Sequence, residues 1–315
     1  MIRLYAPPRD RLRLETNDGR IASLVDRLWN RADDFAPPAL ALEPHEISLH
    51  FVTRPGPGGG PLPEREVAWN LGEEEYELRI GAGFRARIDL GGARIEGDVA
   101  DRLLDEAPEL VARYLEAASA VLFGRRTHTV LHAGAIVGKK GAVVVRGPGG
   151  AGKSTLVAAG WRAGFRVLGD ESLLVSVHDS DELASSVRDL TLLPPSVELL
   201  ALPGTVAAFS GGEEKRRVDL FRSSSPADRK ARRAAAVLLG PREPGPARLA
   251  TLSSSEFREE FARGAIPQER IAGDPDRVAL DWSASNAFRL DGAVDLPGAV
   301  EILRRLGGDP VERAE

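Results

Sequence analysis

The stretch VVVRGPGGAGKSTLVAAG, residues 143–160, decides how the chain is interpreted. An apolar run is followed by a glycine-rich turn and then by residues of good helix propensity, which predicts a strand, a tight loop and a helix in that order. The loop matches G-x-x-x-x-G-K-[ST] at every fixed position from Gly147 to Ser154. This spacing, between a strand and a helix, is typical of a P-loop that binds nucleotide phosphates.

The residue types of the loop indicate how it would bind phosphate. Glycines let backbone N–H groups turn inward, and the start of the following helix adds partial positive charge. We expect Lys153 to reach the β- and γ-phosphates, Ser154 to bind Mg²⁺ and Thr155 to bond the α-phosphate. The residues predicted to bind the nucleotide are Gly147, Pro148, Gly149, Gly150, Ala151, Gly152, Lys153, Ser154 and Thr155.

Composition limits the class of protein. The chain has 315 residues, of which 42 are Lys or Arg and 47 are Asp or Glu, for a formal net charge of -5. Such a balance gives no global positive field, so we expect neither nucleic acid nor a membrane as partner. The chain has no cysteine, which excludes disulfides and thiolate metal sites. No run reaches the ~20 apolar residues of a membrane helix, so we expect a cytoplasmic protein.

The length suits two domains. We expect residues 1–118 to form a smaller, strand-rich α+β domain and residues 119–315 to form an α/β P-loop domain. In the first domain, the hydrophobic pattern predicts a helix over 21–34, strands over 45–52, 73–81 and 85–98, and helical structure over 99–123.

In the second domain, two β-rich runs within residues 127–147 predict a hairpin around Gly138–Gly141 whose second strand enters the loop. The remaining predicted elements are helices over 153–164, 253–265 with Ser255 as cap, and 297–307, strands over 165–177, 234–240 and 277–282, and loops over 204–215 and 241–248.

Asp170 and Glu171 follow the loop after one short helix and half a strand. A nucleotide-binding loop alone does not determine what happens to the γ-phosphate, which depends on carboxylates that hold Mg²⁺ and activate an acceptor. We expect α/β topology to bring this acidic strand beside the strand that leads into the loop. The pair therefore supplies the candidate metal ligands together with Ser154.

The segment LHAGAIVGKKGAVVVRGPGGAGKSTLVAAGWRAGFRVLGDESLLV, residues 131–175, resembles the HPr kinase family, whose catalytic domain is related to phosphoenolpyruvate carboxykinase. Within that family it looks most like the divergent HPr-kinase-related proteins associated with peptide modification. The resemblance implies an α/β P-loop kinase fold, with ATP and Mg²⁺ as cofactors. The family's later motif, E-I-R-G-L-G, has no counterpart in residues 188–212, so we do not expect the phosphocarrier protein as acceptor.

The resemblance also implies roles for single residues. Asp170 takes the place of the aspartate that accepts the proton of the attacking hydroxyl, and Glu171 that of a Mg²⁺ partner. His132 takes the place of the histidine before the P-loop strand. Taken without the resemblance, His132 is equally a strand histidine satisfied by backbone groups.

The densest basic region, EEKRRVDLFRSSSPADRKARR, residues 213–233, follows a Gly-Gly pair. One interpretation is a solvated loop. The other is that Lys215, Arg216 or Arg217 folds over the phosphates and stabilises the charge of the transition state.

These patterns together predict an ATP-dependent kinase that transfers the γ-phosphate to a hydroxyl, in particular a serine of a peptide or protein. Two alternatives stay open: a P-loop NTPase switch or assembly factor that hydrolyses ATP, and an inactive nucleotide-binding adaptor. The sequence also leaves open whether the chain forms a homo-oligomer.

Overall fold

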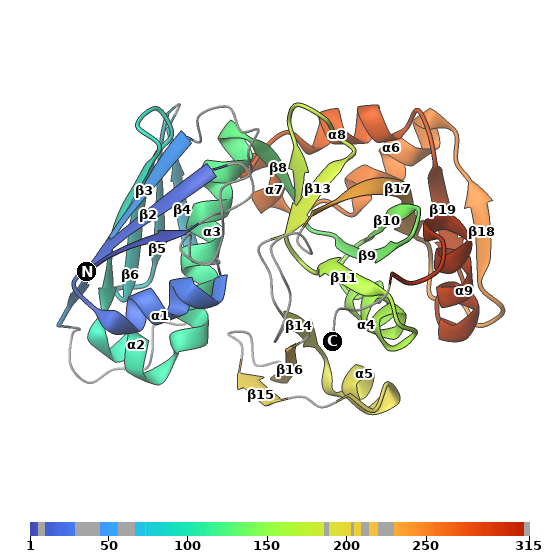
Figure 1. Ribbon diagram of the computed structural model, residues 1–315, viewed down its shortest axis with the longest axis horizontal. Coiled ribbons are helices and arrows are strands. Elements are labelled where there is room, and N and C mark those ends of the chain that lie inside the picture. Colours follow the sequence, from blue (N-terminus) through green and yellow to red (C-terminus); the bar gives the residue numbers. More distant parts are fainter. Residues whose placement is uncertain are drawn as a thin grey trace. The chain divides into compact units, whose positions relative to one another are not determined.

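The computed structural model describes residues 1–5, 10–28, 45–55, 67–72, 74–185, 189–202, 205–208, 214–219 and 230–311. It is a mixed α/β protein with two large sheets (Figure 1). Contacts between residues divide the chain into one unit built on Met1–Arg126 and a second built on Thr127–Ala207 with Glu214–Glu315. The boundary predicted after residue 118 lies inside helix α3 (Pro108–Arg126), and the division falls at the end of that helix.

The first unit is a seven-stranded sheet in the order β1-β2-β3-β7-β6-β5-β4, parallel at β2–β3 and β3–β7 and antiparallel elsewhere. Its elements are β1 (Ile2–Tyr5), β2 (Asp10–Thr16), α1 (Gly19–Leu28), β3 (His45–Arg54), β4 (Val67–Leu71), β5 (Glu75–Ile80), β6 (Phe84–Asp89), β7 (Arg94–Ala100), α2 (Asp101–Glu106) and α3. The predicted helix over 21–34 thus begins at Gly19, and residues 29–34 lie outside the described part of the chain.

Alternation of side chains gives this sheet one buried and one polar face. In β6, Phe84, Ala86 and Ile88 are buried, whereas Arg85 and Arg87 are exposed. The helices contact the buried side through α3 against β6 and β7. The polar side carries cross-strand ion pairs, which contribute little to stability because they are exposed.

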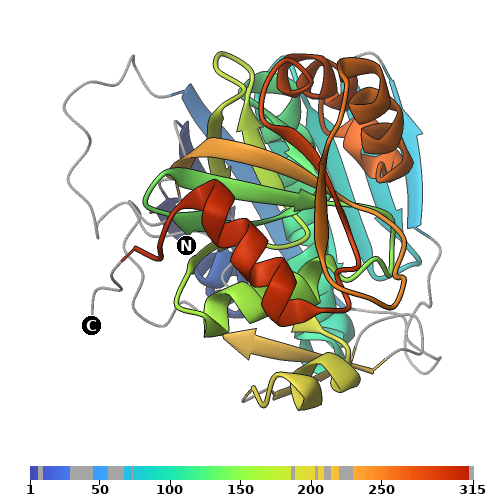
Figure 2. The same ribbon diagram turned by 90° about the vertical axis from the view of Figure 1, so that its right-hand side faces the viewer.

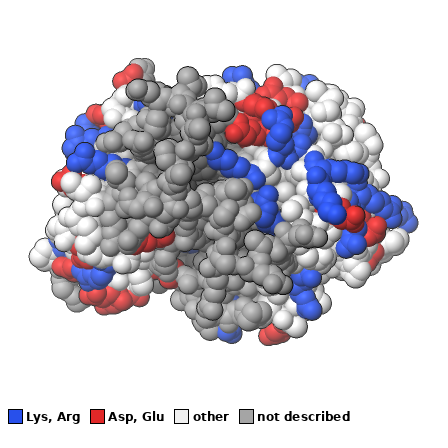
Figure 3. Space-filling model, in the orientation of Figure 1, with Lys and Arg blue, Asp and Glu red and all other residues white. Residues whose placement is uncertain are grey.

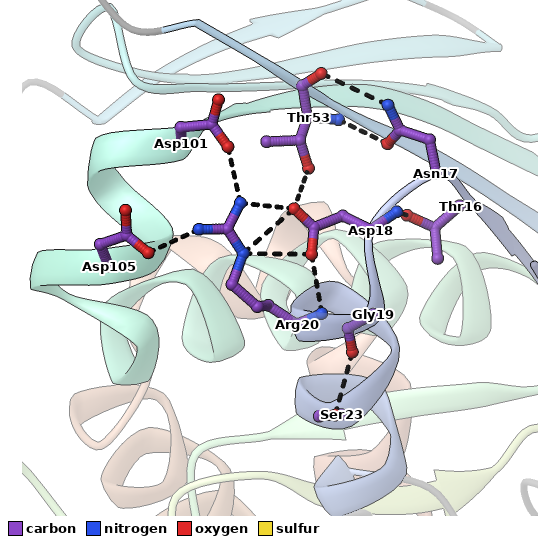
Figure 4. Close-up of polar contacts among 9 residues, drawn as sticks. All are labelled: Thr16, Asn17, Asp18, Gly19, Arg20, Ser23, Thr53, Asp101 and Asp105. Carbon is purple, nitrogen blue, oxygen red and sulfur yellow. Dashed lines mark hydrogen bonds and ion pairs between the residues drawn. The ribbon is translucent and has the colours of Figure 1, made fainter.

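A polar cluster ties the start of α1 to α2 (Figure 4). The guanidinium of Arg20 reaches Asp18 at 2.5 Å, Asp101 at 2.6 Å and Asp105 at 2.5 Å. Hydrogen bonds from Arg20, the largest cause, lower the pKa of Asp18 to about 2. The cluster is largely exposed, so we assign it a local structural role.

The second unit contains a nine-stranded sheet in the order β11-β9-β10-β17-β13-β12-β8, in which β19 also pairs with β17 and β18 pairs with β19, and a small sheet in the order β14-β16-β15. The strands are β8 (His128–Leu131), β9 (Gly134–Gly138), β10 (Gly141–Arg146), β11 (Arg166–Gly169), β12 (Leu173–Ser176), β13 (Glu182–Ser185), β14 (Asp189–Leu192), β15 (Thr205–Ala208), β16 (Glu214–Asp219), β17 (Lys230–Leu239), β18 (Arg248–Thr251) and β19 (Ala287–Asp291). The helices are α4 (Lys153–Arg162), α5 (Pro194–Leu199), α6 (Ser254–Arg263), α7 (Pro267–Ile271), α8 (Pro275–Trp282) and α9 (Leu296–Gly307).

The central strand β10 is buried on both faces, which explains its uninterrupted apolar run. Val143 and Val145 pack in a core with α4 and α9, while Ala142 and Val144 pack in a second core with α6 and α8. Figure 2 shows α9, in red, and the orange helices α6 and α8 on opposite sides of the strands. The sheet therefore holds the end of β10, where the glycine-rich loop begins, between two layers of helices.

Several predicted elements of this unit differ from the structure. The strand predicted over 277–282 is wrong: these residues belong to α8, because Asp274 caps its N-terminus and Pro275 occupies its first turn. The strand predicted over 165–177 is split into β11 and β12 around Asp170 and Glu171.

The other differences are smaller. Residues 127–147 form three strands, because the chain breaks after β8 and β9 starts at Gly134. Ser253, and not Ser255, caps α6 through a capping box with Glu256. The loop predicted over 204–215 contains β15 and the first residues of β16, and its residues 204 and 209–213 lie outside the described chain.

Candidate functional site

The glycine loop, residues 147–152, connects β10 to α4 as the sequence predicts. Gly150 and Gly152 adopt φ angles of 76° and 97°, a region that favours glycine. A Cβ built on Gly149, Gly150 or Gly152 would meet nothing within 4 Å. The loop is thus shaped by backbone conformation and leaves open space beside its glycines, as a phosphate-binding backbone requires.

Lys153, the first residue of α4, is buried beneath this loop. Its Nζ donates hydrogen bonds to the carbonyl oxygens of Gly147 at 2.9 Å and Pro148 at 3.2 Å. Burial is the largest cause that lowers the pKa of Lys153, and the charge of Asp170 opposes it. The ammonium is therefore held by neutral acceptors, which an anion in the loop can replace with a stronger charged partner.

Asp170 directly follows β11 and is almost completely buried, with 2% of its surface exposed. Among the described residues, neither of its carboxylate oxygens has a hydrogen-bond partner of good geometry. Burial, followed by the charge of Glu171, raises the pKa of Asp170 to about 7, although the Ser154 hydroxyl and Lys153 lie close enough to oppose the shift. A buried carboxyl without a partner is costly, and this one lies beside a hydroxyl and an ammonium.

These oxygens fit a divalent cation. Mg²⁺ prefers carboxylate and hydroxyl oxygens and needs only one or two protein ligands when phosphates and waters complete its shell. Within the described part of the chain, no group of three or more His, Asp or Glu side chains is arranged to hold a metal. Asp170 and Ser154, with Glu171 next in sequence, are the residues that could hold such a cation.

Glu171 lies at the break between β11 and β12 with φ of 69°, an uncommon conformation for a residue with a side chain. The turn brings its carbonyl oxygen within 3.2 Å of His132 Nδ1. A carbonyl only accepts, so this contact places the proton on Nδ1 and leaves Nε2 as an acceptor. Burial, then the charge of Lys153, lowers the pKa of His132 and keeps the ring neutral near pH 7.

The acidic strand does not lie beside the strand that leads into the loop, contrary to the prediction. β9 separates them, because β11 pairs with β9 and β9 pairs with β10, both antiparallel. Asp170 nevertheless lies close to α4, because the β9 residue between them is Gly134, which has no side chain. The sequence could not show this arrangement, since it depends on which edge of β9 pairs with β11.

Gly134→Ala tests this close approach. A Cβ on Gly134 would lie 2.6 Å from Val157 Cγ2 and 3.2 Å from Asp170 Oδ1. We expect the substitution to lower the free energy of unfolding by about 1–3 kcal/mol, the usual cost of overpacking. Gly149→Ala is the matched control for stability, because its Cβ would meet nothing within 4 Å. Equal denaturant midpoints for the two variants would contradict the packing argument.

The predicted clamp residues lie on β16. Arg216 pairs with Leu192 and Val218 pairs with Leu190, so all four share one face of the small sheet. Leu190, Leu192 and Val218 are buried in the same core as Leu156 of α4. The structure thus brings the Arg216 strand to the helix that carries Lys153, while the side chains of Lys215 and Arg217 lie outside the described part.

Three residues of this region were missed from the sequence. The hydroxyl of Ser196 in α5 is hydrogen-bonded to the hydroxyl of Thr155, with 2.8 Å between the two oxygens. Arg146 and Glu269 form a buried ion pair beside the loop. Only Arg146 gave a signal, as the one charged residue in the apolar run before Gly147.

Comparisons with known proteins add no family. No protein-family model and no curated protein matches the chain. No described helix is long and apolar enough to cross a membrane. On the face drawn in Figure 3, basic and acidic side chains of the described residues are interspersed.

Proposed function

We propose that the chain is an ATP-dependent kinase that transfers the γ-phosphate of ATP to a hydroxyl, in particular a serine of a peptide or protein. The observation that carries the proposal is Asp170, a buried carboxyl whose oxygens have no hydrogen-bond partner of good geometry among the described residues and which lies beside Ser154 and Lys153. An ordinary structural aspartate would be exposed or hydrogen-bonded. The sequence resemblance to HPr-kinase-related proteins supports the same assignment.

Each residue of the site has its own role in the proposed phosphoryl transfer. Backbone N–H groups of the glycine loop and the Lys153 ammonium bind the phosphates and stabilise the charge that develops on them. Bound Mg²⁺, held by Ser154, Asp170 and Glu171, would supply charge neutralisation on the phosphate oxygens. Arg216, or Lys215 beside it, is the candidate for an additional cation on the leaving group.

Asp170 accepts the proton of the acceptor hydroxyl as its oxygen attacks the γ-phosphorus. The bond between that phosphorus and the β–γ bridging oxygen breaks, and ADP leaves with its electron pair. A base of pKa near the working pH is effective in this role. His132, neutral and bonded to the Glu171 carbonyl, holds the turn that carries the acidic pair.

Transfer of label from γ-labelled ATP tests the proposal. The purified chain, Mg²⁺ and a cell extract are expected to give a labelled acceptor, whose size distinguishes protein from peptide. Asp170→Asn run in parallel is expected to label the acceptor at least about 10²-fold more slowly. Inorganic phosphate without a labelled acceptor would instead indicate an NTPase switch, and ATP binding without ADP formation would indicate an adaptor.

A further inference from the structure

Arg146 and Glu269 form a fully buried ion pair at the entrance to the glycine loop. Their exposed fractions are 1% and 2%, and two parallel hydrogen bonds join them, Nη1 to Oε1 at 2.6 Å and Nη2 to Oε2 at 2.8 Å. Taking two charges out of water costs several kcal/mol each, and a well-packed apolar pair is often as stable. Stability alone therefore does not explain why charges occupy these positions.

The pair makes further contacts that use nearly all of its polar groups. Arg146 Nε donates to the carbonyl oxygen of Phe261 at 3.2 Å, and the guanidinium carbon lies 4.0 Å from the centre of the Phe261 ring. Glu269 Oε1 also accepts the backbone N–H of His132 at 2.5 Å. One carboxylate thus joins α7, the end of β10 and the end of β8.

Both ends of this connection are parts of the candidate site. Arg146 is bonded directly to Gly147, the first glycine of the loop. A Cβ on Gly264, between α6 and α7, would lie 3.3 Å from the Gly147 Cα, so this connection packs against the loop as well. His132 in turn contacts the carbonyl of Glu171, beside Asp170.

We propose that Arg146 and Glu269 are positioning residues that couple the glycine loop to His132. Nucleotide bound in the loop then restrains the His132 end of β8 and, through it, the Glu171 turn. The role rests on the proposed function, because it needs a nucleotide in the loop. It requires a fork-shaped guanidinium, since a single ammonium cannot bond both carboxylate oxygens in parallel.

Hydrogen exchange of the full-length chain tests this coupling, with ATP and Mg²⁺ as the added ligand. In the natural protein we expect ATP to slow exchange in two segments, residues 147–154 and residues 131–134, each by about tenfold or more, within the usual range of coupling between sites. In Arg146→Lys we expect protection of 147–154 to persist and protection of 131–134 to be lost.

Arg233→Lys is the matched control. Arg233 is also buried, with 4% of its side chain exposed, pairs with Asp181 and lies 5.3 Å from the centre of the Trp282 ring. It faces Ala142 at the opposite end of β10 from the loop. We expect Arg233→Lys to retain ATP protection in both segments, because it leaves the Arg146–Glu269 contact intact.

The double variant Arg146→Met/Glu269→Leu separates coupling from folding, because it removes both charges together. The double variant is expected to unfold cooperatively. In it, ATP is expected to slow hydrogen exchange only in residues 147–154. The positioning role would be overturned if ATP still slowed exchange of residues 131–134 in Arg146→Lys. It would also be overturned if Arg233→Lys lost the slowing of exchange in residues 131–134. An absence of ATP protection at 147–154 in the natural protein would instead remove the proposed function and this role with it.

Discussion

Asp170→Asn is expected to lower turnover by about 10²–10⁴-fold, the usual contribution of a general base. The amide of asparagine has nearly the same shape as the carboxyl but cannot take the proton of the acceptor hydroxyl. Lys153 and the glycine loop are unchanged in this variant, so ATP should still bind. Initial rates at saturating ATP and the dissociation constant of ATP, measured separately, check both statements. Full turnover in the variant would remove Asp170 from the reaction.

The same substitution should change how stability depends on pH. The native pKa of about 7 lies above the ordinary value of 3.8, so the folded chain binds more protons than the unfolded chain between these values. Stability supplied by the neutral carboxyl is therefore complete below about pH 4 and is lost as the pH rises through 7. Asparagine has no such dependence.

Relative to Asp170→Asn, the natural protein should lose about 2–3 kcal/mol of unfolding free energy between pH 5 and pH 8, at about 1.36 kcal/mol per pKa unit. The comparison holds even if the buried amide carries its own cost, because that cost does not vary with pH. Urea unfolding of both proteins without nucleotide or metal, at the two pH values, measures the difference. Parallel pH profiles would show that the carboxyl is not held neutral.

The sequence predicted the parts of the fold that local patterns determine. The strand, loop and helix over 143–160 are present because an apolar run, glycines and helix formers follow one another there. Gly164 follows the end of α4 with φ of 98°, a conformation that favours glycine after a helix C-terminus. The strand predicted over 277–282 is wrong because a capping Asp and a first-turn Pro begin a helix there, which outweighs the apolar residues of the stretch.

The sequence could mark several residues of the candidate site, but it could not show how they are arranged. Lys153, Asp170, Glu171 and His132 come from segments that local pattern and resemblance could mark. The buried contact of Glu269 with Arg146 joins residues far apart in sequence, and nothing near Glu269 distinguishes it from other acidic helix residues. Such contacts are set by which helix covers the end of which strand, which is a property of the folded chain.

Lys153→Ala is expected to weaken ATP binding by about 10²-fold or more, because hydrogen bonds to charged groups contribute about 1.5–3 kcal/mol each and Lys153 should bond two phosphates. The folded structure should survive, because within the described part of the chain the buried ammonium bonds only the carbonyls of Gly147 and Pro148. Burial also lowers its pKa, which shows that the charged form costs free energy without an anion.

Lys139→Ala supplies the matched control, because it removes the same charge from the same unit. Lys139 is exposed in the turn between β9 and β10. Titration calorimetry with ATP and Mg²⁺ should give unchanged affinity for this control and the large loss for Lys153→Ala, with similar melting temperatures for both. An affinity within threefold of the natural protein in Lys153→Ala would mean that the nucleotide, if bound, is held elsewhere. Because Lys153 Nζ donates hydrogen bonds to the neutral carbonyls of Gly147 and Pro148, the loss in affinity reports on the charge that phosphate would supply.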